Sequence, residues 1–369
     1  MSTEATVPSM ETGLTLRTED GPKKFIFENE YELMTKLRSG SYGTVYSTRQ
    51  KATQKEYAVK IIDRTKLKPK DDDGVFREVS IMKELVDVEN VVTLIDFYEQ
   101  PKTFYVVQFF ALGGDVFDKI AKRTSYTEQD ARELAVKLLK TMVAIHERKI
   151  CHRDMKPENL LLSNKHDDTS ILLADFGFAK HVPEDGLKTR CGTPAFVAPE
   201  ILVGNRYNEQ VDMWSVGCLL YMLIGGYPPF QDESYRGLFR KIRAADFTFH
   251  DMYWRNVSIH AKQLISKLLT VDPIFRLDAN AALATTWLEI KSENLSSRDL
   301  SSSISELKKF NAKRTFKSAI NVVLWSVGNP FRHEKVSDLN QATGMFVICR
   351  VSCVLWSIPG TYHMKRKTS

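Results

Sequence analysis

The sequence predicts an α+β protein of two lobes, a small β-rich lobe followed by a larger helical lobe. Residues 31–107 are short β-rich segments separated by turns, and longer segments with helical periodicity follow the Gly113-Gly114 pair. The chain has 369 residues, of which 43% are hydrophobic, so it can bury more than one compact core. A β-rich half followed by a helical half favours two units with a cleft between them.

The β-rich lobe is expected over residues 31–110, after a polar segment, residues 1–30, that we predict to be a disordered tail. Phe76–Leu85 is predicted to be a helix because its apolar residues recur at a spacing of three. Segments rich in β-branched and aromatic residues predict five strands: Tyr31–Leu37, Val45–Arg49, Tyr57–Ile62, Val91–Tyr98 and Thr103–Val107.

The helical lobe is expected over residues 111–288. Apolar residues at helical spacing predict three long helices in it: Glu128–Arg148, Val211–Ile224 and Ala261–Leu269. The serine-rich stretch from Glu293 to Ser303 is interpreted as a linker.

A further helix is predicted after this linker. Ser303 is expected to cap it, and Glu306, three residues on, would complete a capping box. Gly328 and Pro330 are expected to mark its far end. Residues 328–369 are a tail in which we find no periodicity that predicts a structure or a role.

Charge, cysteines and hydropathy exclude several classes of protein. The formal net charge of +6, from 52 basic and 46 acidic residues, is too mild to indicate nucleic-acid binding. The cysteines are scattered, which favours free thiols in a reducing compartment over a zinc site. Met345–Ile358 is too short for a membrane span, and the first residues do not resemble a secretory signal. We therefore expect a cytoplasmic protein, with nuclear entry left open.

Several motifs point to phosphoryl transfer. This reaction requires a backbone cradle for phosphates, a lysine, metal ligands and a carboxylate near the attacking hydroxyl. Leu37–Val45 contains Gly40 and Gly43, and Arg38 stands where a Gly-x-Gly-x-x-Gly pattern has its first glycine. Two glycines alone are more often a simple turn, and Lys60 alone would be a surface lysine. These segments gain weight from the motifs that follow them.

The most specific segment is His152-Arg153-Asp154-Met155-Lys156-Pro157-Glu158-Asn159, followed by Asp175-Phe176-Gly177. A single Asp-Phe-Gly triplet occurs by chance in many proteins, but this combination at this spacing almost never does. Ala198-Pro199-Glu200, Asp212–Gly217 and Arg276 complete the series.

Together these motifs resemble those of eukaryotic protein kinases over about Tyr31 to Trp287. The resemblance implies the bilobal protein kinase fold over residues 31–288, with an N-lobe of 31–110 and a C-lobe of 111–288. It also implies ATP and Mg²⁺ as cofactors and transfer of the γ-phosphate of ATP to serine or threonine of protein substrates.

The resemblance assigns a role to each motif residue. Asp154 would accept the substrate hydroxyl proton, and Lys156 would contact the γ-phosphate, which in the family accompanies Ser/Thr substrates. Asn159 and Asp175 would hold the metal. Glu200 and Arg276 would form a buried ion pair that does no chemistry.

ATP is expected between the lobes. Lys60, held by Glu78, would contact the α- and β-phosphates, Asp115 would approach the ribose, and Gln108 would guard the back of the pocket. Backbone atoms near Phe109–Ala111 would bind the adenine. The predicted ATP-binding residues are Leu37, Gly40, Gly43, Val45, Ala58, Lys60, Glu78, Ala111, Asp115 and Leu161.

Within the family the sequence is most similar to calcium/calmodulin-dependent protein kinases of type I. Gly113–Asp118 carries this resemblance, and so does Leu307–Ile320, which looks like their regulatory segment. The resemblance implies that residues 289–327 inhibit the kinase and bind Ca²⁺/calmodulin. Independently, this segment reads as a basic amphipathic helix, which suits calmodulin, a lipid surface or packing on the large lobe.

Three apolar residues are the predicted calmodulin anchors: Phe316, Ile320 and Trp325. Phe316 and Trp325 are nine residues apart, which is about 900° of rotation at about 100° per residue, so they project from opposite sides. Two lobes gripping the helix from both sides could use such anchors.

Comparison with the family predicts how the kinase is regulated. Thr189 matches the activation-loop phosphorylation site of type I kinases, so an upstream kinase is expected. Ser303 aligns with the autophosphorylated threonine of type II, but Leu300 replaces the arginine that precedes it. The tail is too short for the type II assembly domain, so we expect a monomer. The rival interpretation is a calmodulin- or lipid-binding pseudokinase scaffold, for which Arg38 is the only feature.

Overall fold

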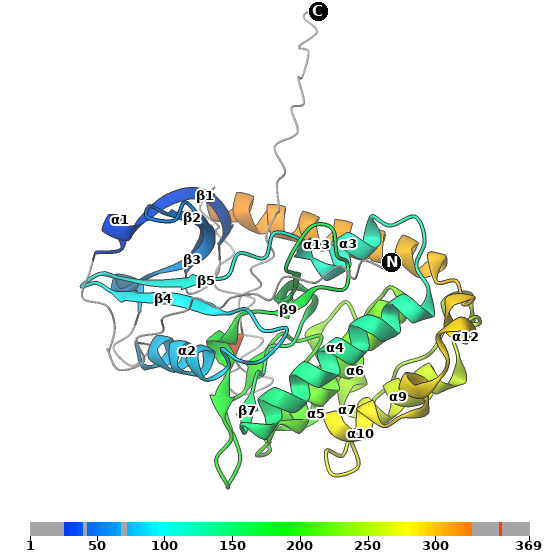
Figure 1. The fold of residues 1–369 in the computed structure, drawn as a ribbon. Coiled ribbons are helices and arrows are strands. Elements are labelled where there is room, and N and C mark those ends of the chain that lie inside the picture. Colours follow the sequence, from blue (N-terminus) through cyan, green and yellow to red (C-terminus); the bar gives the residue numbers. More distant parts are fainter. Residues whose placement is uncertain (1–25, 40–42, 68–71, 327–346, 349–369) are drawn as a thin grey trace, which may run out of the picture.

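The strands of the N-lobe form one antiparallel sheet in the order β1-β2-β3-β5-β4. We describe the chain from a computed structural model, which covers residues 26–39, 43–67, 72–326 and 347–348. The sheet lies on one side of the molecule and most helices on the other (Figure 1). Its strands are β1 Tyr31–Ser39, β2 Thr44–Gln50, β3 Glu56–Asp63, β4 Leu94–Glu99 and β5 Thr103–Gln108.

Helix α2, Asp72–Glu84, is the main helix of the N-lobe. It buries Val75, Val79, Ile81 and Met82. Val79 and Met82 belong to the predicted apolar face, whereas Phe76 of that face is exposed. The two other helical segments of this lobe are short: α1 Phe27–Glu30 and the 3₁₀ helix η1 Arg64–Lys66. Phe27 stacks on Tyr31 and Tyr105 and fixes the entry of the chain to β1.

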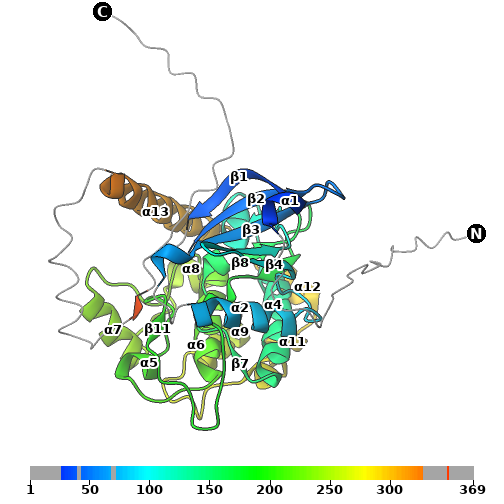
Figure 2. The ribbon, with the colours of Figure 1, turned by 90° about the vertical axis from the view of Figure 1, so that its left-hand side faces the viewer.

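The C-lobe is organised around α6, Gln210–Gly225, in which every residue from Val211 to Gly225 is buried. A helix that is apolar all round belongs in the centre of a core. In Figure 2 the sheet lies above α4, α6 and α9. The helices of this lobe are α3 Val116–Ala121, α4 Glu128–Glu147, α5 Pro199–Val203, α6, α7 Tyr235–Ala244, α8 Asp251–Trp254, α9 Ile259–Leu268, α10 Ala279–Leu283, α11 Thr286–Glu289, α12 Ser292–Ser296 and α13 Ser301–Ser326.

Short strands and 3₁₀ turns line the cleft side of the C-lobe. One small sheet contains β6 Gly114–Asp115, β8 Leu160–Leu162 and β9 Ile171–Leu173, and β7 Ile150–Cys151 pairs with β10 Lys180–His181. The 3₁₀ helices are η3 Pro157–Asn159 and η4 Phe176–Phe178. In the tail the structure describes β12, Val347–Ile348, parallel to β11, Cys191–Gly192.

The predicted α+β architecture of two lobes is confirmed, and most predicted elements lie within a few residues of the observed ones. The strand predicted from Val91 begins at Leu94, because Val91 makes only an isolated bridge to Leu173. Among the described residues, no helix has both the length and the apolar character that crossing a membrane requires.

The predicted linker and capping box are wrong. Part of Glu293–Ser303 is helical, and α13 begins at Ser301, two residues before the predicted cap. Ser303 is fully buried, and its hydroxyl donates a hydrogen bond to the Ile224 carbonyl at the end of α6. Glu306 pairs with Lys309 instead of closing a box. Gly328 and Pro330 lie outside the described residues, although α13 ends at Ser326.

Candidate active site

Three charged side chains from different elements meet in the cleft. Lys60 on β3 places its Nζ atom 2.7 Å and 2.9 Å from the carboxylate oxygens of Glu78 on α2. The same Nζ atom lies 3.5 Å from Oδ1 of Asp175, which follows β9. The predicted pairing of Lys60 with Glu78 is therefore present, and Asp175 joins it.

The electrostatics of this cluster keep Asp175 ionised. Burial alone would raise the pKa of Asp175, but the positive charges of Lys60, Lys156 and Arg38 lower it below its ordinary value. Burial likewise opposes the charged form of Lys60, but Glu78 and Asp175 raise the pKa of Lys60. A side chain at Gly177 would place its Cβ atom 3.3 Å from Oδ1 of Asp175, so glycine leaves room for the cluster.

The catalytic-loop residues Asp154 and Lys156 lie opposite this cluster. Lys156 Nζ donates to Oδ2 of Asp154 at 2.5 Å, and Thr193 Oγ1 donates to Oδ1 at 2.7 Å. Sequence reasoning did not assign a role to Thr193. The sequence feature that could have indicated this contact is the position of Thr193 between Thr189 and the Ala198-Pro199-Glu200 motif. This short stretch must pass the catalytic loop.

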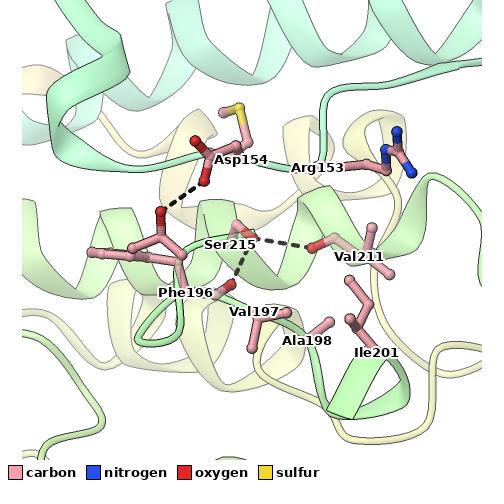
Figure 3. A pocket seen from close by; sticks show the side chains of 10 residues that line it. Arg153, Asp154, Phe196, Val197, Ala198, Ile201, Val211 and Ser215 are labelled. Carbon is pink, nitrogen blue, oxygen red and sulfur yellow. Dashed lines mark hydrogen bonds between the residues drawn. The ribbon is translucent and has the colours of Figure 1, made fainter. Parts of the chain in front are cut away.

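The wall below Asp154 is closely packed. Figure 3 shows Ser215 of α6 donating to the carbonyls of Phe196, at 2.7 Å, and Val211, at 3.2 Å. The cavity beside these residues measures about 10 Å³, which is room for about one water molecule. This cavity is therefore too small for a substrate. The closely packed residues around it support the activation segment.

The catalytic loop is held by Asp212 of α6, a residue that the sequence marked as a structural anchor. Its two carboxylate oxygens accept hydrogen bonds from the backbone N–H groups of His152 and Arg153, both at 2.8 Å. His146 Nε2 lies 3.1 Å from the same carboxylate. The predicted ion pair of Glu200 with Arg276 is present, with an oxygen–nitrogen distance of 2.7 Å.

The oxygens of Asn159 and Asp175 suit a hard cation. Asn159 donates through Nδ2 to the Asp154 carbonyl at 2.8 Å, whereas its buried Oδ1 atom has no hydrogen-bond partner among the described residues. A buried acceptor without a donor is costly, and amide and carboxylate oxygens are ligands that Mg²⁺ prefers. The donor set therefore fits the predicted magnesium ion.

The predicted adenine-binding residues come from both lobes. Leu37, Val45 and Ala58 lie on β1, β2 and β3, and Leu161 lies on β8 directly opposite Asp115 of β6. Ala58 pairs with Gln108 across β3 and β5, and Ala111 is buried just beyond β5.

Of the two glycines of the predicted phosphate loop, only Gly43 belongs to the described residues. Gly40 lies outside the described residues. A side chain at Gly43 would place its Cβ atom 2.5 Å from the Ile61 carbonyl, so packing of β2 on β3 already requires glycine there.

Helix α13 reaches Asp115, the predicted ribose contact, through Arg314. Its guanidinium lies 3.2 Å from Asp115 Oδ2, 2.9 Å from Asp118 Oδ1 and 3.8 Å from Glu158 Oε1. Burial raises the pKa of Asp115 to about 7, although the charge of Arg314 opposes this shift. The predicted anchors Phe316, Ile320 and Trp325 are part of α13, but their side chains lie outside the described part of the chain.

Thr189 lies exposed in the activation segment. Its carbonyl accepts a hydrogen bond from the Tyr207 hydroxyl at 2.6 Å. Arg153, the residue before the catalytic Asp154, donates to the same hydroxyl at 3.2 Å and to the Phe178 carbonyl at 2.6 Å. The structure thus connects Thr189 to the catalytic loop through Tyr207.

Comparison with known proteins agrees with this geometry. A family model for the protein kinase domain matches residues 31–288. Myosin light chain kinase A of Dictyostelium discoideum is 38% identical over 72% of this chain and 90% of that protein. Calcium/calmodulin-dependent protein kinase type IV of Rattus norvegicus is 36% identical over 88% of this chain and 68% of that protein. Calcium/calmodulin-dependent protein kinase type 1 of Caenorhabditis elegans is 37% identical over 79% and 83%.

The chain therefore belongs to the protein kinase family. It is an ATP-dependent protein serine/threonine kinase, and its cofactors are ATP and Mg²⁺.

Proposed function

We propose that this kinase is inhibited by its own residues 289–327 and activated when Ca²⁺/calmodulin removes the second half of α13 from the cleft. The observation that carries this proposal is the set of ion pairs from Arg314 to Asp115, Asp118 and Glu158. Asp115 is the predicted ribose contact and Glu158 belongs to the catalytic loop. A guanidinium on both carboxylates competes with ATP and with a basic substrate.

Each of the active-site residues has a proposed role. When bound, Mg²⁺ would neutralise charge on the phosphates from the oxygens of Asn159 and Asp175. Lys60, oriented by Glu78, holds the phosphate chain. Asp154 orients the substrate hydroxyl and takes its proton, with its own carboxylate positioned by Lys156 and Thr193. The pseudokinase alternative loses support because all of these side chains are present and in contact.

Substitution of the two aspartates tests these tasks. Asp154→Asn and Asp175→Asn should abolish phosphate transfer to a peptide while circular dichroism and thermal unfolding stay unchanged. Folded Asp175→Asn protein with robust Mg-ATP-dependent activity would refute the metal assignment.

The substrate preference follows from Glu158. Arg314 lies 3.8 Å from the Glu158 carboxylate, which suggests that a substrate arginine takes the same place in the active enzyme. In related kinases this position meets a basic residue three before the target hydroxyl, so we propose protein substrates with Arg there and Ser or Thr as acceptor. A peptide array that is indifferent to this arginine, or that prefers tyrosine acceptors, would contradict the assignment.

Calmodulin is the partner that we propose for α13. Two of the relatives carry calmodulin dependence in their names. The exposed residues Lys308, Lys309 and Lys313 make this helix basic, and calmodulin is acidic with Met-rich grooves for apolar anchors. It would bind Phe316, Ile320 and Trp325 and so stabilise only the released state.

A synthetic peptide from Glu306 to Val327 tests calmodulin binding directly. It should bind calmodulin in the presence of calcium and lose affinity on Phe316→Asp. Binding to anionic lipid vesicles, without calcium-dependent calmodulin binding, would favour the lipid-surface alternative instead.

Truncation tests inhibition, and the structure decides where to cut. Ending the chain near Asn294 would also remove Leu295, Leu300, Ile304 and Leu307, which are buried in the core. A chain that ends at Ala312 keeps these residues and loses Arg314 and all three anchors. It should be active without calcium. Equal calcium-independent activity of this variant and the full chain would exclude autoinhibition by α13.

Thr189 is the proposed activating phosphorylation site, modified by an upstream kinase. Its phosphate would add roughly −1.5 to −2 charges close to Arg153, which already connects to this segment through Tyr207. Thr189→Ala should prevent activation by a kinase that phosphorylates the segment. We further propose a monomeric, cytoplasmic enzyme, which light scattering and fluorescence microscopy can test.

A further inference from the structure

Arg38 stands in β1 where the kinase pattern has glycine, and a β-bulge turns its side chain toward the cleft. Lys36 pairs with Tyr46 and Arg38 pairs with Val45, so β1 contains one residue more than β2 between these two pairs. Such a bulge redirects the side chains that follow it. Val45 in turn pairs with Lys60 of β3. Directly paired residues of neighbouring strands point to the same face of a sheet, so Arg38 shares the face of Lys60.

The contacts of Arg38 agree with this register. Its Nη1 atom lies 3.4 Å from the carbonyl oxygen of Glu158 in η3, on the opposite lobe. Arg38 therefore reaches across the cleft to η3, the turn that also carries Asn159.

The backbone tolerates this substitution. Arg38 is not among the residues with positive φ, so the position does not need glycine for a left-handed conformation. An arginine here costs no backbone strain and adds a guanidinium to a site whose predicted phosphate-binding cations, Lys60 and Lys156, are ammonium groups.

We propose that Arg38 is a further phosphate-binding cation of the nucleotide site, which binds phosphate oxygens of ATP in addition to Lys60 and Lys156. A guanidinium presents a planar pair of N–H donors that matches phosphate oxygens, and such charge-assisted bonds are stronger than neutral ones. A bond from Arg38 to a phosphate anion would be stronger than its 3.4 Å contact with the neutral Glu158 carbonyl. The proposal rests on the proposed placement of the phosphates beside Lys60 and Asp175.

Nucleotide binding to the full-length protein tests this role without measuring activity. Isothermal titration calorimetry would give the Kd of ATP, ADP and adenosine, each with Mg²⁺, for wild type, Arg38→Gly, Arg38→Gln and Arg38→Lys. The Gly variant restores the family pattern, and the Gln variant keeps length but removes charge. Both should weaken ATP and ADP roughly tenfold or more, the effect of losing a charged hydrogen bond, and leave adenosine within about twofold. Arg38→Lys should fall between them and wild type.

A Lys60→Met variant separates this proposal from the site on which it rests. If Lys60→Met weakens ATP but Arg38→Gly and Arg38→Gln do not, the role of Arg38 is overturned and the phosphate site stands. If none of the three variants weakens ATP, the phosphate site itself is misplaced. Tighter ATP binding by Arg38→Gly would mean that the arginine obstructs the site, and an equal loss for adenosine would mean a structural role. Either result overturns the proposal.

Discussion

The two halves of α13 are held to the kinase by different forces. The first half, up to Ala312, buries Ile304 and Leu307 in the core of the C-lobe. It also satisfies two carbonyls: Ser303 donates to Ile224, and Asn311 Nδ2 donates to Phe117 at 3.2 Å. At Arg314, beyond Ala312, the described contacts are ion pairs with Asp115, Asp118 and Glu158.

This difference agrees with the proposed inhibition, in which the part of α13 up to Ala312 stays on the C-lobe. Burying an apolar side chain contributes about 1.5–3 kcal/mol, and buried polar groups cost free energy if they lose their partners. A partly buried ion pair gains less, because removing both charges from water offsets the attraction. The first half is therefore part of the folded domain, whereas relief of the proposed inhibition requires a partner that separates Arg314 from its acidic partners.

The largest effect should come from breaking the first half. Leu307→Ala removes a fully buried side chain, which should lower the free energy of unfolding by about 2–5 kcal/mol. Its exposed neighbour provides the control, since Lys308→Ala should change stability by less than about 0.5 kcal/mol. Urea unfolding measures both. If the two variants are equally stable, this half of α13 does not belong to the core.

Breaking the second half should raise the basal activity, and it should also lower stability, because Arg314→Ala leaves the buried Asp115 without its cation. Arg314→Ala removes the ion pairs that occupy Asp115 and Glu158, so calcium-independent phosphorylation of a peptide should rise roughly 5- to 150-fold, the usual range of coupling between sites. Lys313→Ala is the matched control, because Lys313 is exposed and basic but lies outside this cluster. An unchanged basal rate in folded Arg314→Ala protein would show that Arg314 does not inhibit.

The catalytic cluster could be placed from sequence because its parts are tied to motifs of fixed spacing. Lys60 and Glu78 meet as the resemblance to protein kinases implies. Asp154 belongs to the eight-residue loop motif and Asp175 to the Asp-Phe-Gly triplet. Each of them follows a short strand, β7 and β9 respectively. The contact of Thr193 with Asp154 could not be predicted, because a threonine in a loop has no periodic signal. Only the tertiary fold brings it to Asp154.

The start of α13 could not be predicted for a related reason. Serine is common both in linkers and at helix N-caps, so Ser301–Ser303 looked like the end of a linker with a cap. The structure uses Ser303 inside the helix because Gly226 leaves space beside it: a Cβ atom at Gly226 would lie 2.2 Å from the Ser303 carbonyl oxygen. Such close approach between elements 77 residues apart is invisible to local patterns. The same holds for Arg314, whose acidic partners come from β6, α3 and η3.

The smallest expected effect is a dependence of stability on pH. It comes from Asp115, the partner of Arg314, and not from the first half of α13. Asp115, which receives Arg314, has a pKa of about 7 because burial disfavours its charged form, against about 3.9 in an unfolded chain. Between these values the folded protein holds a proton that the unfolded chain releases. The contribution of Asp115 to stability is therefore complete at low pH and is lost as the pH rises to about 7.

Asp115→Asn removes this titration and keeps the shape of the side chain. The unfolding free energy of wild type minus that of the variant should fall as the pH rises from 5 to 7, by at most about 1.4 kcal/mol per pH unit, and level off above 7. Leu307→Ala should leave this profile unchanged, because it alters the first half only. Arg314→Ala should shift the levelling point to higher pH, because it removes the charge that holds the pKa of Asp115 down. A difference that stays constant from pH 5 to 8 would mean that Asp115 is ionised throughout, and the two halves of α13 would then differ in contacts but not in response to pH.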